Sequence, residues 1–196
     1  MNREKNEKLV SPNITLGLVH WPCWNQKKEV ICTNVTNFDI HDIARAARSY
    51  GVKRYFIINK AQEQLMFVHR VLDHWRVGEG HEHNPMRKAA IGMIETAQTL
   101  EEAISLHDKK PFVVATSARD ELGCPRIGFS ALKEKVLHEP DQPVFLVLGT
   151  GWGLHSSVFE LCDAVLEPIK GRSEDDFRHL SVRSAASIML DRLLGL

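Results

Sequence analysis

Several features that would assign a protein to a class at once are missing from this sequence. The four cysteines form no Cys-x-x-Cys pair, so their spacing supports neither a zinc ribbon nor a dithiol redox motif. No apolar run approaches the roughly 20 residues that a membrane span needs. The first ten residues, MNREKNEKLV, lack the apolar core of a secretion signal. We therefore expect a cytoplasmic protein with free thiols and no membrane partner.

A net charge is also absent. The 25 basic and 25 acidic side chains cancel, so no global field draws the chain to nucleic acid, and RNA binding would need a local basic patch. At 196 residues, of which 43% are hydrophobic, the chain has the size and composition of one globular domain. We treat residues 1–196 as a single domain and expect residues 1–10 to be flexible.

The sequence does contain a regular alternation of short β-like runs with helical patterns. Several of these runs are apolar throughout, which is typical of strands that helices cover on both faces. The alternation predicts an α/β fold with a mostly parallel sheet flanked by helices. The predicted strands are Ile14–Val19, Arg54–Ile58, Phe112–Ala115, Val144–Leu148 and Ala164–Leu166.

The clearest helix lies in the stretch NFDIHDIARAARSYG, residues 37–51. Asp39 is placed to cap its start, and Gly51 closes it as a C-terminal glycine does. Between them, apolar residues recur at the i, i+3, i+4, i+7 spacing of a buried face. Arg45 falls off this apolar stripe, which leaves it to face either solvent or a ligand. Three further helices are predicted, at Val182–Leu194, Glu95–His107 and Ser130–Leu137.

Residues 69–90 fit the alternation poorly. The stretch HRVLDHWRVGEGHEHNPMRKAA holds four histidines, a tryptophan and two glycines, and we predict an irregular insertion there. Helical zinc pairs need a motif such as H-E-x-x-H, which is missing, so no metal site is predicted. Asn84 and Arg87 are instead the candidates for contact with an acceptor substrate.

The stretch LGTGWGLH, residues 148–155, directly follows a predicted strand. A glycine-rich turn in this place lets a ligand approach the backbone closely. Its glycines read G-x-G-x-G, whereas the dinucleotide fingerprint needs G-x-G-x-x-G and the P-loop needs a lysine after its last glycine. The spacing excludes both phosphate loops and leaves two interpretations open, a structural turn or a site for another ligand.

Two more junctions follow within the last fifty residues. AVLEPIKGRS runs from a strand into a loop with a proline and a glycine, and HLSVRSAASI runs from a polar segment into a helix. In open α/β sheets, ligands bind at the C-terminal ends of strands and at the N-terminal ends of helices. Three such junctions in succession favour a cofactor pocket.

Four stretches resemble the SPOUT-class RNA methyltransferases. TNFDIHDIARAARSYGV is similar to the family's first motif, in which a polar residue, usually asparagine, opens a helix and an arginine follows six positions on. Here these residues are Asp39 and Arg45. LVLGTGWGL resembles the second motif, and AVLEPIKG with HLSVRSAASIML resembles the closing pair. The likeness is nearest to a small bacterial branch with an LVHxP-like start, here LVHWP.

The resemblance implies a fold, a cofactor and partners. The family binds S-adenosylmethionine in a C-terminal trefoil knot, works as a homodimer and methylates RNA. We therefore expect a SPOUT-like domain that transfers a methyl group to tRNA or rRNA, with Glu167 near the ribose of the cofactor. The expected cofactor contacts are Thr116, Leu148, Gly149, Thr150, Gly151, Gly153, Leu154, Glu167, Pro168, Ile169, Gly171, Leu180, Ser181, Val182 and Ala185.

The same resemblance places Arg45 at the chemistry. Methyl transfer is an in-line displacement in which positioning and charge matter most, and an arginine can orient a base, hold a phosphate or favour deprotonation of a nitrogen nucleophile. Asp39 stands where the family has asparagine and is either a base or a helix cap. Two other functions stay open, a non-catalytic S-adenosylmethionine-binding sensor or assembly protein, and an unrelated nucleotide-binding α/β enzyme.

Overall fold

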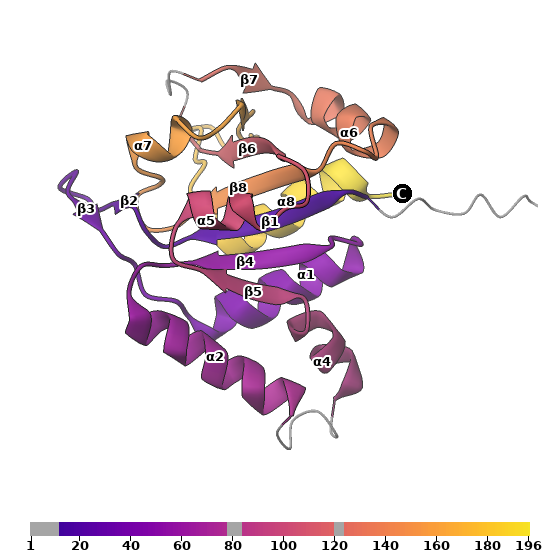
Figure 1. Ribbon diagram of the computed structural model, residues 1–196. Coiled ribbons are helices and arrows are strands. Elements are labelled where there is room, and N and C mark those ends of the chain that lie inside the picture. The colour runs from indigo at the N-terminus through magenta and orange to yellow at the C-terminus, as the bar shows by residue number, and fades with distance from the viewer. Residues whose placement is uncertain (1–11, 78–83, 120–123) are drawn as a thin grey trace, which may run out of the picture.

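A parallel sheet forms the centre of the protein. The computed structural model describes residues 12–77, 84–119 and 124–196. The sheet contains β1 (Ile14–Val19), β4 (Arg54–Ile58), β5 (Ile94–Ala97), β6 (Phe112–Thr116), β7 (Arg126–Ile127), β8 (Val144–Gly149) and β9 (Ala164–Leu166). Its order is β5-β4-β1-β8-β6-β9-β7, and every neighbouring pair is parallel (Figure 1). The five predicted strands and the mostly parallel α/β fold are confirmed.

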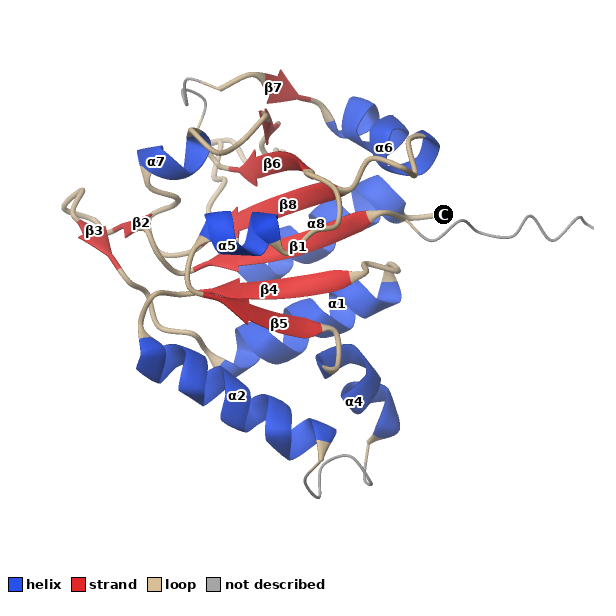
Figure 2. Ribbon diagram, in the orientation of Figure 1, coloured by secondary structure: helices blue, strands red, loops and turns tan. Residues whose placement is uncertain are grey.

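Helices cover both faces of this sheet, as Figure 2 shows. The C-terminal helix, α8 (Val182–Leu194), shares one face with α1 (Ala44–Ser49) and with the π-helical turn η1 (Asp39–Ile43) that leads into α1. The opposite face carries α5 (Leu100–Ser105) and α7 (Ser156–Phe159). The remaining helices are α2 (Gln62–Arg76), α4 (Pro85–Ile91) and α6 (Phe129–His138).

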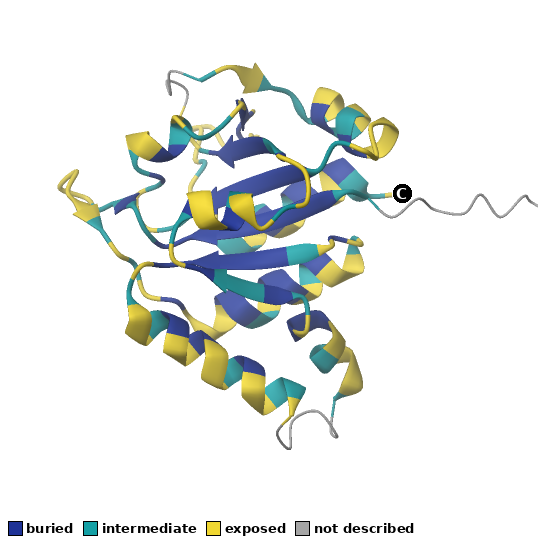
Figure 3. Ribbon diagram, in the orientation of Figure 1, coloured by how far each residue is buried: buried dark blue, intermediate teal, exposed yellow. Residues whose placement is uncertain are grey.

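Two apolar layers hold the sheet and the helices together. Successive residues of a strand point to opposite faces, so Leu16 and Leu18 of β1 pack under α1 and α8, while Val19 packs with the layer that contains α5 and α7. The central strands are buried almost throughout, and the exposed residues lie on the outer faces of the helices (Figure 3). Among the helices of the described segments, none is both long and apolar enough to cross a bilayer.

The predicted helices agree with the structure except in one place. The last helix has the bounds Val182–Leu194, as predicted, and the helix predicted at Ser130–Leu137 is α6. The helix predicted at Glu95–His107 is wrong in its first part, because Ile94–Ala97 pairs with β4 as an edge strand. The helix there begins only at Leu100, after Thr99 accepts a hydrogen bond from the backbone of Glu102.

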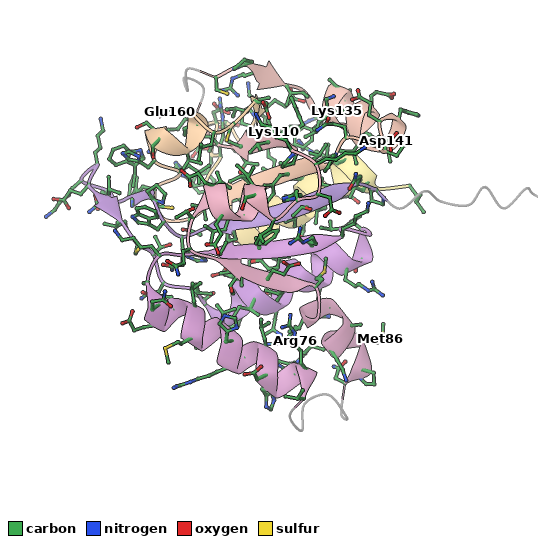
Figure 4. The ribbon with its side chains drawn as sticks, in the orientation of Figure 1. Arg76, Met86, Lys110, Lys135, Asp141 and Glu160 are labelled. Atoms are coloured by element: carbon green, nitrogen blue, oxygen red, sulfur yellow. The ribbon has the colours of Figure 1, made fainter. Side chains whose placement is uncertain are left out.

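The segment predicted to be an irregular insertion, residues 69–90, is largely helical in the structure. Residues 69–76 belong to α2 and residues 85–91 form α4, with Pro85 at the first helical position. Arg76 lies between these two helices in Figure 4 and donates hydrogen bonds to the carbonyls of Gly92 and Ile94. Residues 78–83, with His81 and His83, lie outside the described residues, and so do residues 1–10, which the sequence predicts to be flexible.

A hairpin of two short strands, β2 (Cys23–Trp24) and β3 (Val30–Ile31), projects beyond the carboxyl end of β1. Its first strand lies against the loop that follows β8. The amide of Trp152 donates to the carbonyl of Trp24 at 2.9 Å, and the amide of Trp24 donates to the carbonyl of Gly153 at 2.9 Å. The hairpin thus braces the loop around which the functional site is built.

Candidate cofactor and substrate site

A cavity of about 850 Å³ opens at the carboxyl ends of β1, β6 and β8. This is the edge of an open parallel sheet where ligands usually bind, and its volume lies in the range of small-molecule sites. It is enclosed by the start of α8, by the loops after β6, after β8 and after β9, and by the segment from His20 to Asp39. Of the residues predicted to bind a cofactor, the cavity is lined by Thr116, Leu148, Gly149, Thr150, Gly151, Gly153, Ile169, Leu180, Ser181, Val182 and Ala185.

The loop after β8 depends on its glycines. Gly151 and Gly153 have φ angles of 59° and 100°, in the left-handed region that side chains rarely adopt. At Gly149, an added Cβ would lie 2.8 Å from Cγ and 3.0 Å from the backbone nitrogen of Leu154. Leu154 itself is buried beneath the loop and does not line the cavity. The loop therefore brings bare backbone to the cavity surface.

Three other residues predicted at the cofactor lie outside the cavity. Glu167 turns the other way, where its Oε1 accepts a hydrogen bond from the amide of Phe129 at 2.7 Å and so caps the start of α6. Pro168 and Glu167 line a separate hollow with Arg126, Lys170 and Arg192. Gly171 lines neither. In this structure the Glu167 carboxylate therefore faces α6 and not the cavity where a ribose contact was predicted.

The residues predicted to contact the acceptor also lie elsewhere. Asn84 caps α4, its Oδ1 accepting a hydrogen bond from the amide of Arg87 at 3.0 Å. The Arg87 guanidinium lies 4.8 Å from the ring centre of Trp75, a cation–π contact. Arg45 is exposed on α1 and does not line the cavity of its own chain. The structure thus gives Asn84 and Arg87 local structural partners.

Asp39 lines the cavity but does not cap its helix in the way that was predicted. Thr36 supplies the cap: its Oγ1 accepts from the Asp39 amide at 3.2 Å, and its own amide donates to Oδ2 of Asp39 at 3.2 Å. The Thr36 hydroxyl also donates to Oδ2, at 2.6 Å. This exchange is a capping box with aspartate in the place of glutamate. The other carboxylate oxygen, Oδ1, accepts from Nη1 of Arg183 at 3.1 Å. The buried carboxylate is therefore held by both η1 and α8.

His20 follows β1 directly and is 1% exposed at the cavity wall. Its Nδ1 lies 2.8 Å from Oγ1 of Thr33, which lies 2.5 Å from Oγ1 of Thr150. The Thr150 hydroxyl in turn donates to the carbonyl of Val19 at 2.9 Å. Burial lowers the pKa of His20 to about 4, against the opposing effect of Asp39, so the imidazole is neutral at pH 7.

The sequence alone did not predict that His20 lines the cavity. Nothing local marks His20 as a site residue, because its position depends on Thr33 and on Thr150, which are distant in the chain. The LVHWP start carried the only signal. The residues that line the cavity without having been assigned to it are His20, Thr33, Asn34, Ser117, Ala118, Arg119, Trp152, Arg178, His179 and Met189.

No group of three or more histidine, cysteine or acidic side chains is arranged to hold a metal within residues 12–77, 84–119 and 124–196. The four cysteines are free thiols. Burial raises the pKa of Cys162 to about 12 and also raises the pKa of Cys23, so neither is a reactive thiolate at pH 7.

A family model described as "SAM-dependent RNA methyltransferase" matches residues 13–195. The chain belongs to this family. It is 38% identical over 98% of its length to a protein of Oleidesulfovibrio alaskensis named tRNA (guanine-N(1)-)-methyltransferase, but it spans only 44% of that relative. An uncharacterised protein of Aquifex aeolicus is 33% identical, and there the match covers 95% of this chain and 91% of the relative.

Solved structures share the fold at low sequence identity. A putative methylase family protein from Neisseria gonorrhoeae superimposes with a TM-score of 0.63 and 16% identity, over 99% of this chain and 86% of that one. The SpoU methyltransferase AviRb from Streptomyces viridochromogenes, in complex with AdoMet, gives a TM-score of 0.52 at 14% identity, over 99% and 62%. The chain therefore shares the α/β fold of these two solved structures.

Proposed function

We propose that this chain binds S-adenosylmethionine in the cavity at the carboxyl ends of β1, β6 and β8 and transfers its methyl group to RNA. One observation carries the proposal. Three loops that are separated in the sequence, and that resemble the family's cofactor motifs, meet around one cavity of suitable size in a chain that belongs to the family. The match to relatives named as tRNA methyltransferases favours tRNA over rRNA as the acceptor.

The lining of the cavity fits the adenosine part of such a cofactor. Leu148, Ile169, Leu180, Val182 and Met189 provide apolar walls for the adenine ring. Where Gly149 and Gly151 expose the backbone, amide and carbonyl groups are available to the polar edge of the ring and to the ribose. When bound, S-adenosylmethionine supplies an electrophilic methyl group on a sulfonium.

The role of Arg45 in this proposal requires a second copy of the chain. Arg45 is exposed on α1, which packs against α8, and the neighbouring Phe38 is a large apolar side chain with 66% of its surface exposed. We propose that this face forms the homodimer, in which Arg45 of one protomer reaches the cavity of its partner. There the guanidinium would orient the acceptor nucleotide or hold its phosphate. Asp39, already bonded to Thr36 and Arg183, would act as a structural support.

The proposal includes a knot and a location. The loops after β8 and β9, with the start of α8, would form the C-terminal trefoil knot that the SPOUT resemblance implies. The protein would act in the cytoplasm. The convergence of these three segments on one cavity supports the knot. An experimentally determined structure, in which the chain path through residues 144–196 is traced, tests it.

Transfer of a labelled methyl group from S-adenosylmethionine to RNA tests the proposed activity. The RNA is isolated from a strain that lacks the gene, so that its acceptor sites are unmodified. Label should enter this RNA with the wild-type chain, and Arg45→Ala should abolish the transfer while leaving S-adenosylhomocysteine affinity unchanged. Arg48→Ala is the matched control, since Arg48 is exposed on the same helix. Full activity in Arg45→Ala would contradict its catalytic role.

A further inference from the structure

The cavity has a second wall, which the predicted cofactor loops do not provide. It comes from the first forty residues and consists of His20, Thr33, Asn34 and Asp39. All four of these side chains are polar, whereas the rest of the lining includes glycine backbone and several apolar side chains. Because the cofactor loops already account for one side, the second wall is available to the methyl acceptor.

Hydrogen bonding fixes the orientation of the His20 ring, whose Nδ1 lies 2.8 Å from Oγ1 of Thr33. Thr33 in turn lies 2.5 Å from Oγ1 of Thr150, and the Thr150 hydroxyl lies within hydrogen-bond distance of the Val19 carbonyl. When Thr150 donates its one proton to that carbonyl, Thr33 donates to Thr150 and accepts from Nδ1. In this arrangement Nδ1 carries the ring proton, and Nε2 is left as an acceptor.

No described protein group donates a hydrogen bond to Nε2. Nε2 of His20 is buried and has no hydrogen-bond partner among the described residues. A buried polar atom without a partner costs free energy, and such atoms in native proteins usually await a water molecule or a ligand. The imidazole is also neutral at pH 7, because burial lowers its pKa to about 4. Nε2 at the cavity wall is thus suited to an N–H or O–H donor of a bound molecule.

Trp152 provides a flat apolar surface in the same cavity. Its side chain is 52% exposed in the loop after β8, and the Trp152 carbonyl accepts a hydrogen bond from Arg119 at 2.8 Å, which fixes the backbone there. Nucleobases that are taken out of a strand stack on such aromatic rings and are read by hydrogen bonds to their edges. A ribose has no comparable flat face.

We propose that the cavity admits the nucleobase of the acceptor nucleotide, with Trp152 stacking on its face and Nε2 of His20 accepting a hydrogen bond from an N–H on its edge. The inference rests on the proposed function and extends it: the methyl group goes to a base and not to a ribose hydroxyl. His20 acts as a substrate-binding residue that selects an N–H donor.

Alkaline hydrolysis of the labelled RNA separates the two acceptor classes. A methylated 2′-hydroxyl makes the adjoining phosphodiester resistant to alkali, so ribose methylation leaves labelled dinucleotides, whereas base methylation leaves labelled mononucleotides. We expect the label in mononucleotides. Label in dinucleotides would overturn this inference and leave the proposed function standing. If the wild-type chain transfers no label to RNA, the proposed function fails, and this inference fails with it.

Variants of His20 test its part in binding. His20→Asn keeps an amide near Nδ1 to bond Thr33 and removes the Nε2 acceptor, so kcat/KM for RNA should fall by about tenfold or more, while the Kd for S-adenosylhomocysteine stays unchanged. His20→Gln, which places an amide oxygen near the Nε2 position, should recover part of the lost activity. A loss of S-adenosylhomocysteine affinity in His20→Asn, at unchanged Tm, would overturn the inference by assigning Nε2 to the cofactor.

His107 provides the matched control. Its Nε2 is likewise buried without a partner among the described residues, but it packs against the rings of Phe56 and Phe145, away from the cavity. His107→Asn should leave kcat/KM unchanged. An equal loss in both histidine variants would show a general effect of stability and overturn the specific role of His20. Trp152→Ala should raise KM for RNA with little change in kcat, and an unchanged KM would contradict the stacking contact.

Discussion

Oδ1 of Asp39 accepts a hydrogen bond from Nη1 of Arg183 at 3.1 Å. This bond joins the helix that starts after residue 36 to the first turn of α8. Both ends of this contact flank the cavity, and the Asp39 side chain is 6% exposed, whereas that of Arg183 is 35% exposed. The pair therefore holds two of the segments that shape the site in a fixed relation.

Asp39→Asn should lower the free energy of unfolding by about 1 kcal/mol, because its amide oxygen can still accept from Thr36 but its amide nitrogen then faces Arg183 and cannot accept. Urea denaturation measures the change. Asp42→Asn is the control, since Asp42 is half exposed and lies 3.6 Å from the same guanidinium. Its effect should stay below about 0.5 kcal/mol. Equal effects of the two variants would contradict the buried role of Asp39.

Gly149→Ala should weaken S-adenosylhomocysteine binding by about tenfold or more, because its Cβ would collide with the backbone and side chain of Leu154 and displace the loop. Gly171→Ala should have no effect, since its Cβ would meet nothing within 4 Å and the residue lines no part of the cavity. Calorimetric titration measures both affinities. Full affinity in Gly149→Ala would show that the loop is not a cofactor contact.

Glu167→Ala should lower stability by about 1 kcal/mol and leave cofactor affinity unchanged, because the carboxylate caps α6 and does not face the cavity. Glu167→Gln retains a carbonyl oxygen and should cost less. Thermal unfolding and titration with S-adenosylhomocysteine separate the two effects. A loss of cofactor affinity in Glu167→Ala without loss of stability would show that Glu167 contacts the ribose of the cofactor.

Acid should destabilise the protein over a defined window. The pKa of His20 is about 4 in the folded chain and 6.5 in the unfolded one, so the unfolded state binds more protons between these values. Stability from this group is complete above pH 6.5 and falls toward pH 4, by at most about 3 kcal/mol. Burial also lowers the pKa of His41 and of His107, so protonation of these groups destabilises the folded state as well.

Urea midpoints at pH 7 and pH 4.5 measure this window. The midpoint should fall on acidification in the wild type and should fall less in His20→Asn, which has no group to protonate at this position. An equal fall in the two proteins would show that His20 is not buried in its neutral form.

The strands were predictable because burial on both faces leaves an apolar run that needs no distant partner to be recognised. Ile94–Ala97 escaped this rule, since IETA is short, half polar and lies at the sheet edge, where Glu95 forms an ion pair with Arg54 at 2.6 Å. Its apolar and polar residues continue the spacing of the helix that follows, so the two elements are predicted as one helix. An edge strand of this kind is defined by its neighbour in the sheet more than by its own residues.

The site was predictable on one side only. The loops after β8 and β9 carry their signal in glycine, proline and the start of a helix, and most of their residues do meet around the cavity. His20 could not be assigned in the same way, because its orientation depends on a hydroxyl 130 positions later, that of Thr150, through Thr33. Glu167 shows the reverse case, a residue beside a ligand loop whose side chain serves a neighbouring helix.

Calorimetric titration of the wild-type chain shows whether the cavity beside Gly149 is an S-adenosylmethionine site. S-adenosylhomocysteine should bind with a saturable signal at one site per chain, and ATP and NAD should give none. Binding of ATP or NAD without any response to S-adenosylhomocysteine would show that the cavity belongs to another nucleotide.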